Sequence, residues 1–501
     1  MKAESIVDIA KRRGFFWQSS GIYGGLAGFY DYAHLGTSMK RRWENIWRNY
    51  FLGLDDNFHE IQPCLIMHEK VFSASGHLES FIDPVVRCMK CLHVERADHL
   101  LEDNLSGNFE GLSVDRMTEM IRKHNIRCPR CGGELEDVGV INMMFPVDIG
   151  TGNPLRAYLS PETAQGAYVN FKQEFEALRR KLPLGLAIIG RAFRNEISPR
   201  NVLIRMREFT QAELQIFFDP ETINEHPRFS EVSDYKLVLF PAKGRKSGKV
   251  TEMKCREVVG KYGLPEFYVY YMARVQQFYL DVLGFSRKVF RFRELTEEEK
   301  AFYNKYHWDV ELHLESLGGF REVAGVHYRT DHDLKGHQRV SGINMTVNIN
   351  GREFIPHVLE LSFGVDRNIY ALFELCYREE KERTLFRFPG RVSPFDAGVF
   401  PLVNRDGLPE KSREVYSFLK KSGFDVFYDS GGSIGRRYRR IDEIGVAAGI
   451  TIDYQTLQDS TVTLRDRDSM KQIRVGIAEL PTVLRRFLDG ERIENLGRVI
   501  N

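Results

Sequence analysis

The sequence predicts an α/β chain with a large mixed core and a smaller C-terminal domain of alternating strands and helices. Three observations support this prediction. The 501 residues are several times the usual length of one domain. Two strand-like segments, 184–197 and 205–218, flank a short loop and indicate an antiparallel hairpin. From about residue 389, strand and helix patterns alternate over roughly a hundred residues, which is typical of an independent α/β domain.

The composition is that of an ordinary globular protein, with 43% hydrophobic and 28% charged residues, which argues against disorder and against a membrane protein. Lys and Arg number 71 against 69 Asp and Glu, so any surface that binds nucleic acid must be local. No segment has the pattern of a secretory signal or a membrane span. Four of the seven cysteines form two C-x-x-C pairs, which suits a reducing compartment, and we expect a cytoplasmic protein.

Residues 1–85 are expected to form the first part of the core. A glycine-rich stretch with tight turns precedes a helix, TSMKRRWENIWRNYF, whose apolar residues recur at helical spacing. We interpret that stripe as a packed face in preference to an aromatic binding surface. The segment FHEIQPCLI then indicates a strand, and Pro63 inside it predicts an edge or interface position.

Residues 86–141 are polar and charged and indicate an insertion with a metal site. Two C-x-x-C pairs supply four thiolates that can surround one zinc ion: Cys88, Cys91, Cys128 and Cys131. With four protein ligands the zinc would be structural. The alternative is a set of reduced cysteines left from a site that has lost its metal.

The remaining segments alternate between core and additions. The core resumes at 142–218, where Ser160-Pro161-Glu162 predicts a helix start before the hairpin. Residues 219–300 have weak strand signals and are expected to be a partly helical insertion. The core ends at 301–385 with a strand that runs into a helix, and 386–501 form the C-terminal domain.

Several charged groups have two readings on residue type alone. The hairpin carries Arg194, Asn195, Glu196, Arg205 and Arg207, which form either a solvated sheet face with cross-strand salt bridges or a floor that binds phosphates. Three glutamates border the same predicted sheet and are, taken alone, unrelated surface carboxylates: Glu162, Glu213 and Glu360. A basic patch could meet a phosphate backbone or be a solvated helix start: Arg436, Arg437, Arg439 and Arg440.

Ten stretches along nearly the whole chain resemble the α2-type glycyl-tRNA synthetases, class II enzymes of the archaeal and eukaryotic branch. They are IYGGLAGFYDY, SASGH, VERADHL, YLSPETAQG, FRNEISPRN, RMREFTQAEL, HYRTDHDL, LELSFGVDR, GSIGRRYRRIDEIG and TLRDRDSMKQIR. The resemblance implies a class II antiparallel sheet flanked by helices, a zinc-ribbon-like insertion and a C-terminal α/β anticodon-binding domain. It also implies that the chain activates glycine with ATP and transfers it to tRNA(Gly).

The family's motif 2 matches Phe193 to Phe209, and its motif 3 matches LELSFGVDR. The resemblance implies that Arg194 holds the α-phosphate, Glu196 reads the adenine amino group and Phe209 stacks on the ring. It places Arg367 on the γ-phosphate and Glu322 where ATP and Mg²⁺ bind. The implied catalytic residues are Arg194, Glu322 and Arg367. The implied ATP contacts are Arg194, Asn195, Glu196, Arg205, Met206, Phe209, Glu322, Val323, Gly364 and Arg367.

The resemblance implies that Glu162, Glu213 and Glu360 together hold the glycine ammonium, with help from Ser362. It also places Arg96 near the substrate. Leu361 departs from the proline that relatives commonly have between the glutamate and the serine. Pro63 matches the motif 1 proline at the dimer interface, so a homodimer is implied. The four arginines of the basic patch are expected to bind tRNA.

Two other functions fit parts of the sequence less well. A synthetase-like accessory protein that binds nucleic acid without catalysis is disfavoured, because an inactive relative would be free to lose Arg194, Glu196 and Arg367. A class II enzyme for threonine, serine or proline is disfavoured by acidic residues at all three pocket positions. Glycine needs no editing domain, since a rigid pocket can exclude any Cβ, and we predict none.

Overall fold

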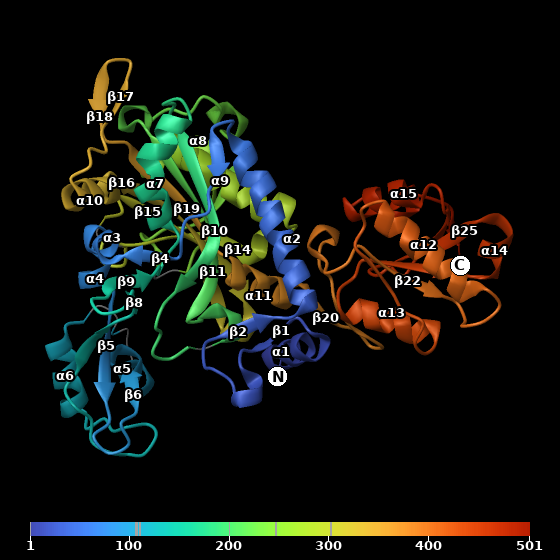
Figure 1. Ribbon diagram of the computed structural model, residues 1–501, viewed down its shortest axis with the longest axis horizontal. Helices are drawn as coiled ribbons and strands as arrows, with labels where there is room; N and C mark the ends of the chain where they lie inside the picture. The colour runs from blue at the N-terminus through green and yellow to red at the C-terminus, as the bar shows by residue number, and fades with distance from the viewer. Residues whose placement is uncertain are drawn as a thin grey trace.

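The computed structural model describes residues 2–105, 109, 112–199, 201–245, 248–300 and 303–500, with the backbone alone for 2–5. The chain forms a central core, a small insertion at one side of it and a C-terminal domain at the other (Figure 1). The N-terminus lies in the core, near the junction with the C-terminal domain. Within the described chain, no helix is both long and apolar enough to cross a bilayer.

A nine-stranded, mostly antiparallel sheet organises the core, as predicted for this fold class. Only the β12/β14 and β10/β3 pairs are parallel. In spatial order the strands are β13 (Thr251–Lys254), β12 (Lys236–Phe240), β14 (Phe290–Glu294), β15 (Tyr306–Leu314), β16 (Gly319–Thr330), β19 (His357–Gly364), β11 (Glu208–Phe218), β10 (Leu184–Phe193) and β3 (Phe58–Glu60).

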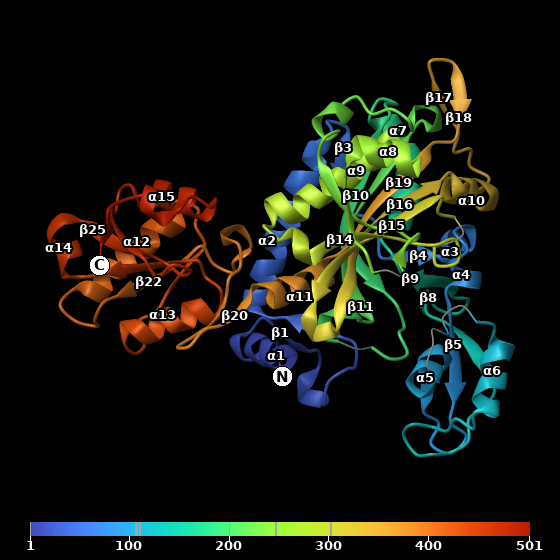
Figure 2. The same ribbon diagram turned by 180° about the vertical axis from the view of Figure 1, so that it is seen from behind.

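Helices cover both faces of this sheet, as Figure 2 shows from behind. The main apolar cluster lies under the helices α1 (Lys2–Arg13), α2 (His34–Phe51), α8 (Cys255–Tyr262), α9 (Glu266–Gln277) and α11 (Val365–Cys376). Trp43 and Trp47 of α2 are fully buried in it, which confirms the packed face predicted for this helix. A second cluster lies under α7 (Ala164–Ala177) and α10 (His332–Ser341).

The alternation of side chains along β11 decides which residues can reach a ligand. Leu214 and Ile216 enter the main cluster, whereas Phe217 packs with α7 on the opposite face. Since successive side chains of a strand point to opposite faces, Glu213 and Gln215 lie on the side of Phe217. Polar side chains therefore gather on the less apolar face of the sheet.

Three local predictions differ from the structure. Residues 219–300 contain the helices α8 and α9, as expected for a partly helical segment, but also β12, β13 and β14, which continue the sheet; these strands have only four or five residues each and give a weak signal. The strand predicted around Pro63 is interrupted, with β3 ending at Glu60 and β4 (Ile66–His68) beginning later, since proline has no N–H to donate. The helix predicted at Ser160 begins at Ala164.

The insertion folds around its own small apolar cluster. Its sheet has the order β6 (Val94–Arg96), β5 (Ile82–Arg87) and β7 (Gly139–Asn142), covered by α5 (Ala97–Asn104) and α6 (Val114–Lys123). A second three-stranded sheet, β4, β9 (Leu155–Leu159) and β8 (Phe145–Ile149), lies between the insertion and the core (Figure 1). The short helices α3 (Glu69–Ala74) and α4 (His77–Ser80) follow β4.

The C-terminal domain has the alternating strands and helices that the sequence predicts. Its six-stranded sheet has the order β23 (Val426–Tyr428), β22 (Ala397–Pro401), β24 (Ala448–Ile452), β25 (Thr461–Asp466), β26 (Gln472–Gly476) and β27 (Val499–Ile500). Its helices are α12 (Leu408–Lys421), α13 (Ile434–Glu443), α14 (Tyr454–Asp459) and α15 (Leu480–Leu488). Three hairpin pairs complete the chain: β1 (Phe16–Gln18) with β2 (Tyr30–Tyr32), β17 (Val347–Ile349) with β18 (Arg352–Phe354), and β20 (Tyr377–Glu379) with β21 (Thr384–Phe386).

Candidate active site

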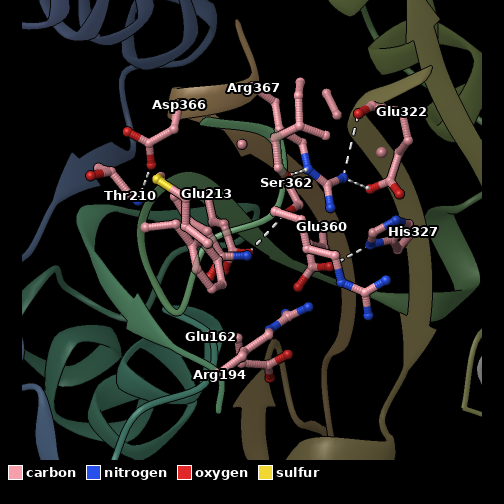
Figure 3. A pocket seen from close by; sticks show the side chains of 18 of the residues that line it. Glu162, Arg194, Thr210, Glu213, Glu322, His327, Glu360, Ser362, Asp366 and Arg367 are labelled. Atoms are coloured by element: carbon pink, nitrogen blue, oxygen red, sulfur yellow. Dashed lines mark hydrogen bonds and ion pairs between the residues drawn. The ribbon is translucent and has the colours of Figure 1, made fainter. Parts of the chain in front are cut away.

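A cavity of about 210 Å³ opens between the β10/β11 hairpin, the strands β15, β16 and β19, and the start of α11. Arg194 and Arg367, which are 173 positions apart in the sequence, both line it (367 − 194 = 173). Figure 3 shows Arg367 and Glu322 at one side of this cavity and Glu162 and Arg194 at the other. The predicted site residues that line it are Glu162, Arg194, Glu196, Arg205, Met206, Phe209, Glu213, Glu322, Glu360, Ser362, Gly364 and Arg367.

Arg367 is positioned by the change from strand to helix at Gly364. It lies in the first turn of α11, and its guanidinium donates to the carbonyl oxygen of Ile204 at 3.2 Å. It also forms an ion pair with Glu322 of β16 at 3.0 Å. Both side chains of this pair are partly exposed, so the pair stabilises the fold by less than about 1 kcal/mol. The guanidinium is therefore free to exchange Glu322 for an anionic ligand.

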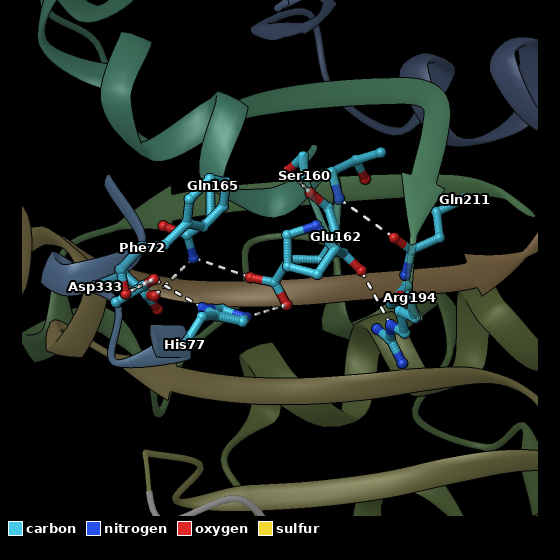
Figure 4. A network of polar contacts seen from close by, with 12 residues as sticks. Phe72, His77, Ser160, Glu162, Gln165, Arg194, Gln211 and Asp333 are labelled. Atoms are coloured by element: carbon cyan, nitrogen blue, oxygen red, sulfur yellow. Dashed lines mark hydrogen bonds and ion pairs between the residues drawn. The ribbon is translucent and has the colours of Figure 1, made fainter. Parts of the chain in front are cut away.

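Arg194 follows the end of β10 and lies between two aromatic rings. Its guanidinium carbon is 5.3 Å from the ring centre of Phe81 and 5.2 Å from that of Phe209. Its Nε donates to the carbonyl oxygen of Pro161 at 3.0 Å (Figure 4), and its side chain lines the cavity. These contacts hold the plane of the guanidinium while leaving its two terminal NH₂ groups for a ligand.

Buried Glu196 pairs with the partly exposed Arg205 across the base of the motif 2 loop. Arg205 Nε donates to Glu196 Oε2 at 2.7 Å, and the glutamate is 7% exposed. Arg207 donates to the backbone oxygen of Glu196 at 2.8 Å. Arg205 and Arg207 of the hairpin are therefore both engaged by Glu196, and the hairpin is not a simple solvated face.

Sheet register explains why glutamates from distant segments meet. Glu213 of β11 is opposite Ser362 of β19, and Gln215 is opposite Glu360. On the other side of β19, Glu360 is opposite His327 of β16. Because these residues alternate with apolar ones on three neighbouring strands, all of them project from one face.

Glu360 is fully engaged by basic and polar partners. It accepts hydrogen bonds from Gln215 Nε2 at 2.8 Å, from Arg329 at 3.1 Å and from His327 Nδ1. Burial alone would raise its pKa, but Arg329 and the hydrogen bond from His327 outweigh it and hold the pKa at about 2. Glu360 is therefore a carboxylate whose charge is already compensated.

Glu162 is compensated in the same way, as Figure 4 shows. It accepts from Gln165 Nε2 at 2.9 Å and lies 3.6 Å from His77 Nε2 and 3.7 Å from Arg329. Burial opposes ionisation, yet His77 and Arg329 hold the pKa of Glu162 well below its usual range. Residues 160–163 stay outside α7, and this non-helical segment carries Glu162 to the cavity.

Glu213 is the exception among the three glutamates. Its oxygens accept hydrogen bonds from the hydroxyls of Thr163, at 2.7 Å, and Ser362, at 2.8 Å. No ion pair of Glu213 occurs among the described residues. Burial, together with the charges of Glu360 and Glu162, raises its pKa to about 8. Of the three glutamates, Glu213 is thus the one without an ion-pair partner among the described residues; Asp366, which also lines the cavity, has no ion pair there either but accepts from the hydroxyl of Tyr32 at 2.6 Å.

Three predicted site residues do not line the cavity. Arg96 is buried in the insertion, 3.1 Å from Asp83 and 3.0 Å from Asp98. Asn195 donates its backbone N–H to Met143, and Val323 is buried in the main apolar cluster. For Arg96 and Val323, the local partners of the side chain account for the orientation.

Sequence reasoning missed the residues that hold the glutamates in place. Arg329 is 3% exposed and connects Glu162, Glu360 and Asp333, the last at 2.9 Å. His327 and His307 also line the cavity. The available signal was the stretch HYRTDHDL, in which Arg329 and Asp333 are four positions apart; it carried the resemblance but no assigned role.

The four cysteines of the insertion meet at one point. The Sγ atoms of Cys88 and Cys131 are 3.5 Å apart, and those of Cys91 and Cys128 are 3.7 Å apart. All four sulfur atoms lie within 4.8 Å of one another. Thiolates about 2.3 Å from a tetrahedral zinc ion are separated by similar distances, so this donor set fits zinc.

The basic patch of the C-terminal domain divides into exposed and buried members. Arg437 is 1% exposed and donates to the carbonyl oxygens of Pro401, Ser430 and Gly432, so its side chain is engaged within the domain, unlike the exposed phosphate-binding residue expected from the sequence. Arg440 is paired with Asp429 at 2.6 Å. Arg436 and Arg439 are exposed.

Two protein-family models match the chain. The model described as the tRNA synthetase class II core domain (G, H, P, S and T) matches residues 150–376. The model described as the anticodon binding domain matches residues 396–487. The cavity therefore lies within the class II core.

Curated relatives match over nearly the entire chain. The glycine–tRNA ligase of Aeropyrum pernix is 41% identical, covering 99% of this chain and 98% of the relative. Those of Thermococcus gammatolerans and Pyrococcus furiosus are each 40% identical, covering 98% of this chain and 99% of each relative. Among solved structures, the prolyl-tRNA synthetase of Cryptosporidium parvum with L-proline and AMP shares the fold, with a TM-score of 0.57 and 13% identity over 99% of this chain and 76% of that one.

Proposed function

Because this chain belongs to the glycine–tRNA ligases, which activate glycine with ATP and transfer it to tRNA, we propose that the cavity between Arg194 and Arg367 is where both steps take place. One observation supports this most directly. The two arginines approach the cavity from separate elements, beside a buried glutamate without a cation partner. Such a cavity suits a ligand that has a polyanion at one end and an ammonium at the other.

We assign the phosphate end to the two arginines. The glycine carboxylate attacks the α-phosphate of ATP, and pyrophosphate leaves with the electrons of the broken P–O bond. Arg194, whose Nε donates to the carbonyl oxygen of Pro161, neutralises the charge that develops at the α-phosphate. Arg367 exchanges Glu322 for the γ-phosphate. The enzyme uses Mg²⁺ with ATP, and the ion reduces the negative charge of the polyphosphate.

We assign the adenine to the motif 2 hairpin. The side chains of Glu196, Arg205, Met206 and Phe209 all line the cavity, and Phe209 offers a ring face. Glu196 is fixed by Arg205 at 2.7 Å, so one of its oxygens is oriented before ATP binds. A fixed acceptor beside an aromatic ring fits an amino-substituted purine. The proximity of Arg194 to Phe209 implies that the guanidinium shifts when adenine stacks there.

We assign the glycine ammonium to Glu213. Glu162 and Glu360 already have Arg329 and a histidine each, whereas Glu213 has only the hydroxyls of Thr163 and Ser362. A bound ammonium supplies the missing cation. Larger amino acids would need space for a Cβ in a site whose walls are buried and hydrogen-bonded.

The C-terminal domain is proposed to bind the anticodon stem through exposed Arg436 and Arg439, with Arg440 reaching phosphate if it leaves Asp429. Arg437 has a structural task there instead, because it ties α13 to the end of β22. We assign residues 386–501 to this domain.

The insertion is proposed to hold a structural zinc ion through Cys88, Cys91, Cys128 and Cys131. The sulfur separations support it. Such a site would fix the β5/β6 knuckle to the loop after α6 and would stabilise the insertion around its small apolar cluster.

A homodimer and a cytoplasmic location also belong to the proposal. The segment around Pro63 is exposed at an edge strand, with Leu65 at 37% and Ile66 at 43%, which suits a protein interface. Light scattering tests it: a molar mass near twice 58.1 kDa is expected, and 58.1 kDa would contradict it. Cell fractionation tests the location.

ATP–pyrophosphate exchange with a panel of amino acids tests the proposed function. Glycine should support exchange, while alanine, serine, threonine and proline should not at equal concentration. Exchange with serine and none with glycine would overturn the assignment of the pocket.

A further inference from the structure

We propose that His307, Asp309 and His327 form a binding site for a divalent transition metal such as Zn²⁺ in the wall of the cavity, separate from the four-cysteine site. The ligand atoms of these three side chains all lie within 4.8 Å of one another. Whether a metal ion binds to these three residues does not depend on where ATP and glycine bind in the cavity. Its occupant is a metal ion with a free coordination position toward the cavity.

Strand register brings the three side chains together. His307 and Asp309 are two positions apart on β15 and therefore lie on one face. His307 is opposite His327 of β16, and Asp309 is opposite Gly325. The imidazole rings are 4.1 Å apart between centres, and His307 Nε2 lies 3.0 Å from Asp309 Oδ1. Two imidazoles and a carboxylate on a rigid sheet are a usual donor set for zinc.

The free nitrogen of His327 points toward this cluster. Its Nδ1 donates to Glu360, so Nε2 is the atom that remains for a metal. A histidine that binds metal almost always donates its other N–H to a carboxylate or a carbonyl, and Glu360 provides that partner here. The position opposite Asp309 must lack a side chain, because a Cβ on Gly325 would lie 2.2 Å from His327 Nε2.

An unpaired buried oxygen lies on the other side of His307. Asn304 is 4% exposed and lines the cavity; its Nδ2 lies 3.1 Å from His307 Nδ1, and its Oδ1 has no hydrogen-bond partner. Rotating the amide by half a turn would bring Oδ1 to His307 Nδ1 as an acceptor. The imidazole would then carry its proton on Nδ1, and the lone pair of Nε2 would be available to a metal. Asn304 would take the same supporting part for His307 that Glu360 takes for His327.

The charges around the cluster suit a dication. Asp309 contributes one negative charge, and its Oδ2 is 3.3 Å from Arg293, which orients the carboxylate without using Oδ1. Both histidines line the cavity, whereas Asp309 is buried behind them. Three protein ligands leave a fourth tetrahedral position, and it would face the cavity, where water or an anionic oxygen can occupy it.

Metal binding by the full-length enzyme tests this proposal. The stripped protein is equilibrated with Zn²⁺, dialysed, and its zinc content per chain is measured. The variants are His307→Gln and Asp309→Asn, with His313→Gln as the matched control on the exposed far end of β15. Thermal unfolding of the stripped proteins confirms that each variant folds. His327 is left unchanged because it also supports Glu360.

The expected result is a loss of one zinc equivalent per chain in both variants and no loss in the control. All of these proteins have the same four cysteines, so zinc bound there contributes equally to each of them. The difference in zinc content per chain therefore reports only the proposed site. Co²⁺ bound at the site should give the weak absorption of nitrogen and oxygen ligands. Equal zinc content in the parent and all three variants would overturn the proposal. It would also be overturned if the Co²⁺ absorption that His307→Gln and Asp309→Asn lose were that of thiolate ligands.

Discussion

Of the three pocket glutamates, Glu213 is the one that lacks a basic partner, and replacing it by Gln takes away its ability to ionise when the glycine ammonium binds, with little change in shape. The amide can still accept from Thr163 or Ser362, which contact the carboxylate at 2.7 and 2.8 Å. It cannot compensate the glycine ammonium. Breaking a buried charge pair by removing one partner costs about 2–5 kcal/mol, and a loss of about 3 kcal/mol corresponds to a ~150-fold weaker affinity for glycine.

Exchange kinetics measure this loss directly. In Glu213→Gln the KM for glycine should rise by roughly two orders of magnitude, while the KM for ATP should stay within about twofold. Glu208→Gln, on the same strand but outside the cavity, is the matched control. A KM for glycine within about threefold of the parent value in Glu213→Gln would refute the assignment of this carboxylate to the ammonium.

Although Glu213→Gln should weaken glycine binding, it should not weaken the fold at pH 8. The pKa of Glu213 is raised from 4.5 to about 8, so the folded protein keeps a proton that the unfolded chain releases. This group therefore makes the free energy of unfolding fall as pH rises from about 4.5 to 8, on the order of a few kcal/mol in total. Glu213→Gln should lose that slope and match or exceed the parent stability at pH 8. A less stable variant at pH 8 would contradict the pKa.

Four further predictions follow from the site and its surroundings. Glycine binding at pH 7 should release close to one proton, because Glu213 changes from protonated to ionised; calorimetry in two buffers of different ionisation enthalpy would show no release if this is wrong. Arg367→Ala should lower exchange at least 100-fold with unchanged thermal unfolding, since its ion pair with Glu322 is partly exposed; near-normal exchange would disprove the phosphate role. Removing zinc, or Cys128→Ser, should speed hydrogen exchange in residues 82–142 while core strands keep their protection; unchanged exchange would argue against a structural metal. Arg437→Ala should destabilise the C-terminal domain by about 2–3 kcal/mol, because three carbonyls lose their donor, whereas Arg436→Ala should raise the KM for tRNA without changing stability; the reverse pattern would exchange their roles.

The sequence predicted what depends on local pattern. The β10/β11 hairpin, the strand-to-helix change before Arg367 and the alternation in the C-terminal domain all follow from periodicity and turn residues. The family resemblance, carried by ten stretches, named half of the residues that line the cavity. Local pattern missed the strands of 219–300, where β12, β13 and β14 have only four or five residues each and join the sheet through pairing with strands elsewhere in it.

Long-range partners could not be predicted from the sequence. Whether a glutamate is compensated depends on Arg329, which is more than a hundred positions from Glu162 and Glu213. Arg437 and Arg436 are neighbours of one type in one helix, yet one is buried and the other exposed. Their difference comes from which side of α13 packs on β22, which residue type does not reveal.

A crystal structure with a non-hydrolysable analogue of glycyl-adenylate would test the central claim most directly. The account predicts the phosphate mimic beside Arg194, with Arg367 released from Glu322, and the ammonium within hydrogen-bond distance of Glu213. An analogue bound with its ammonium away from Glu213, or with neither arginine near the phosphate position, would contradict it.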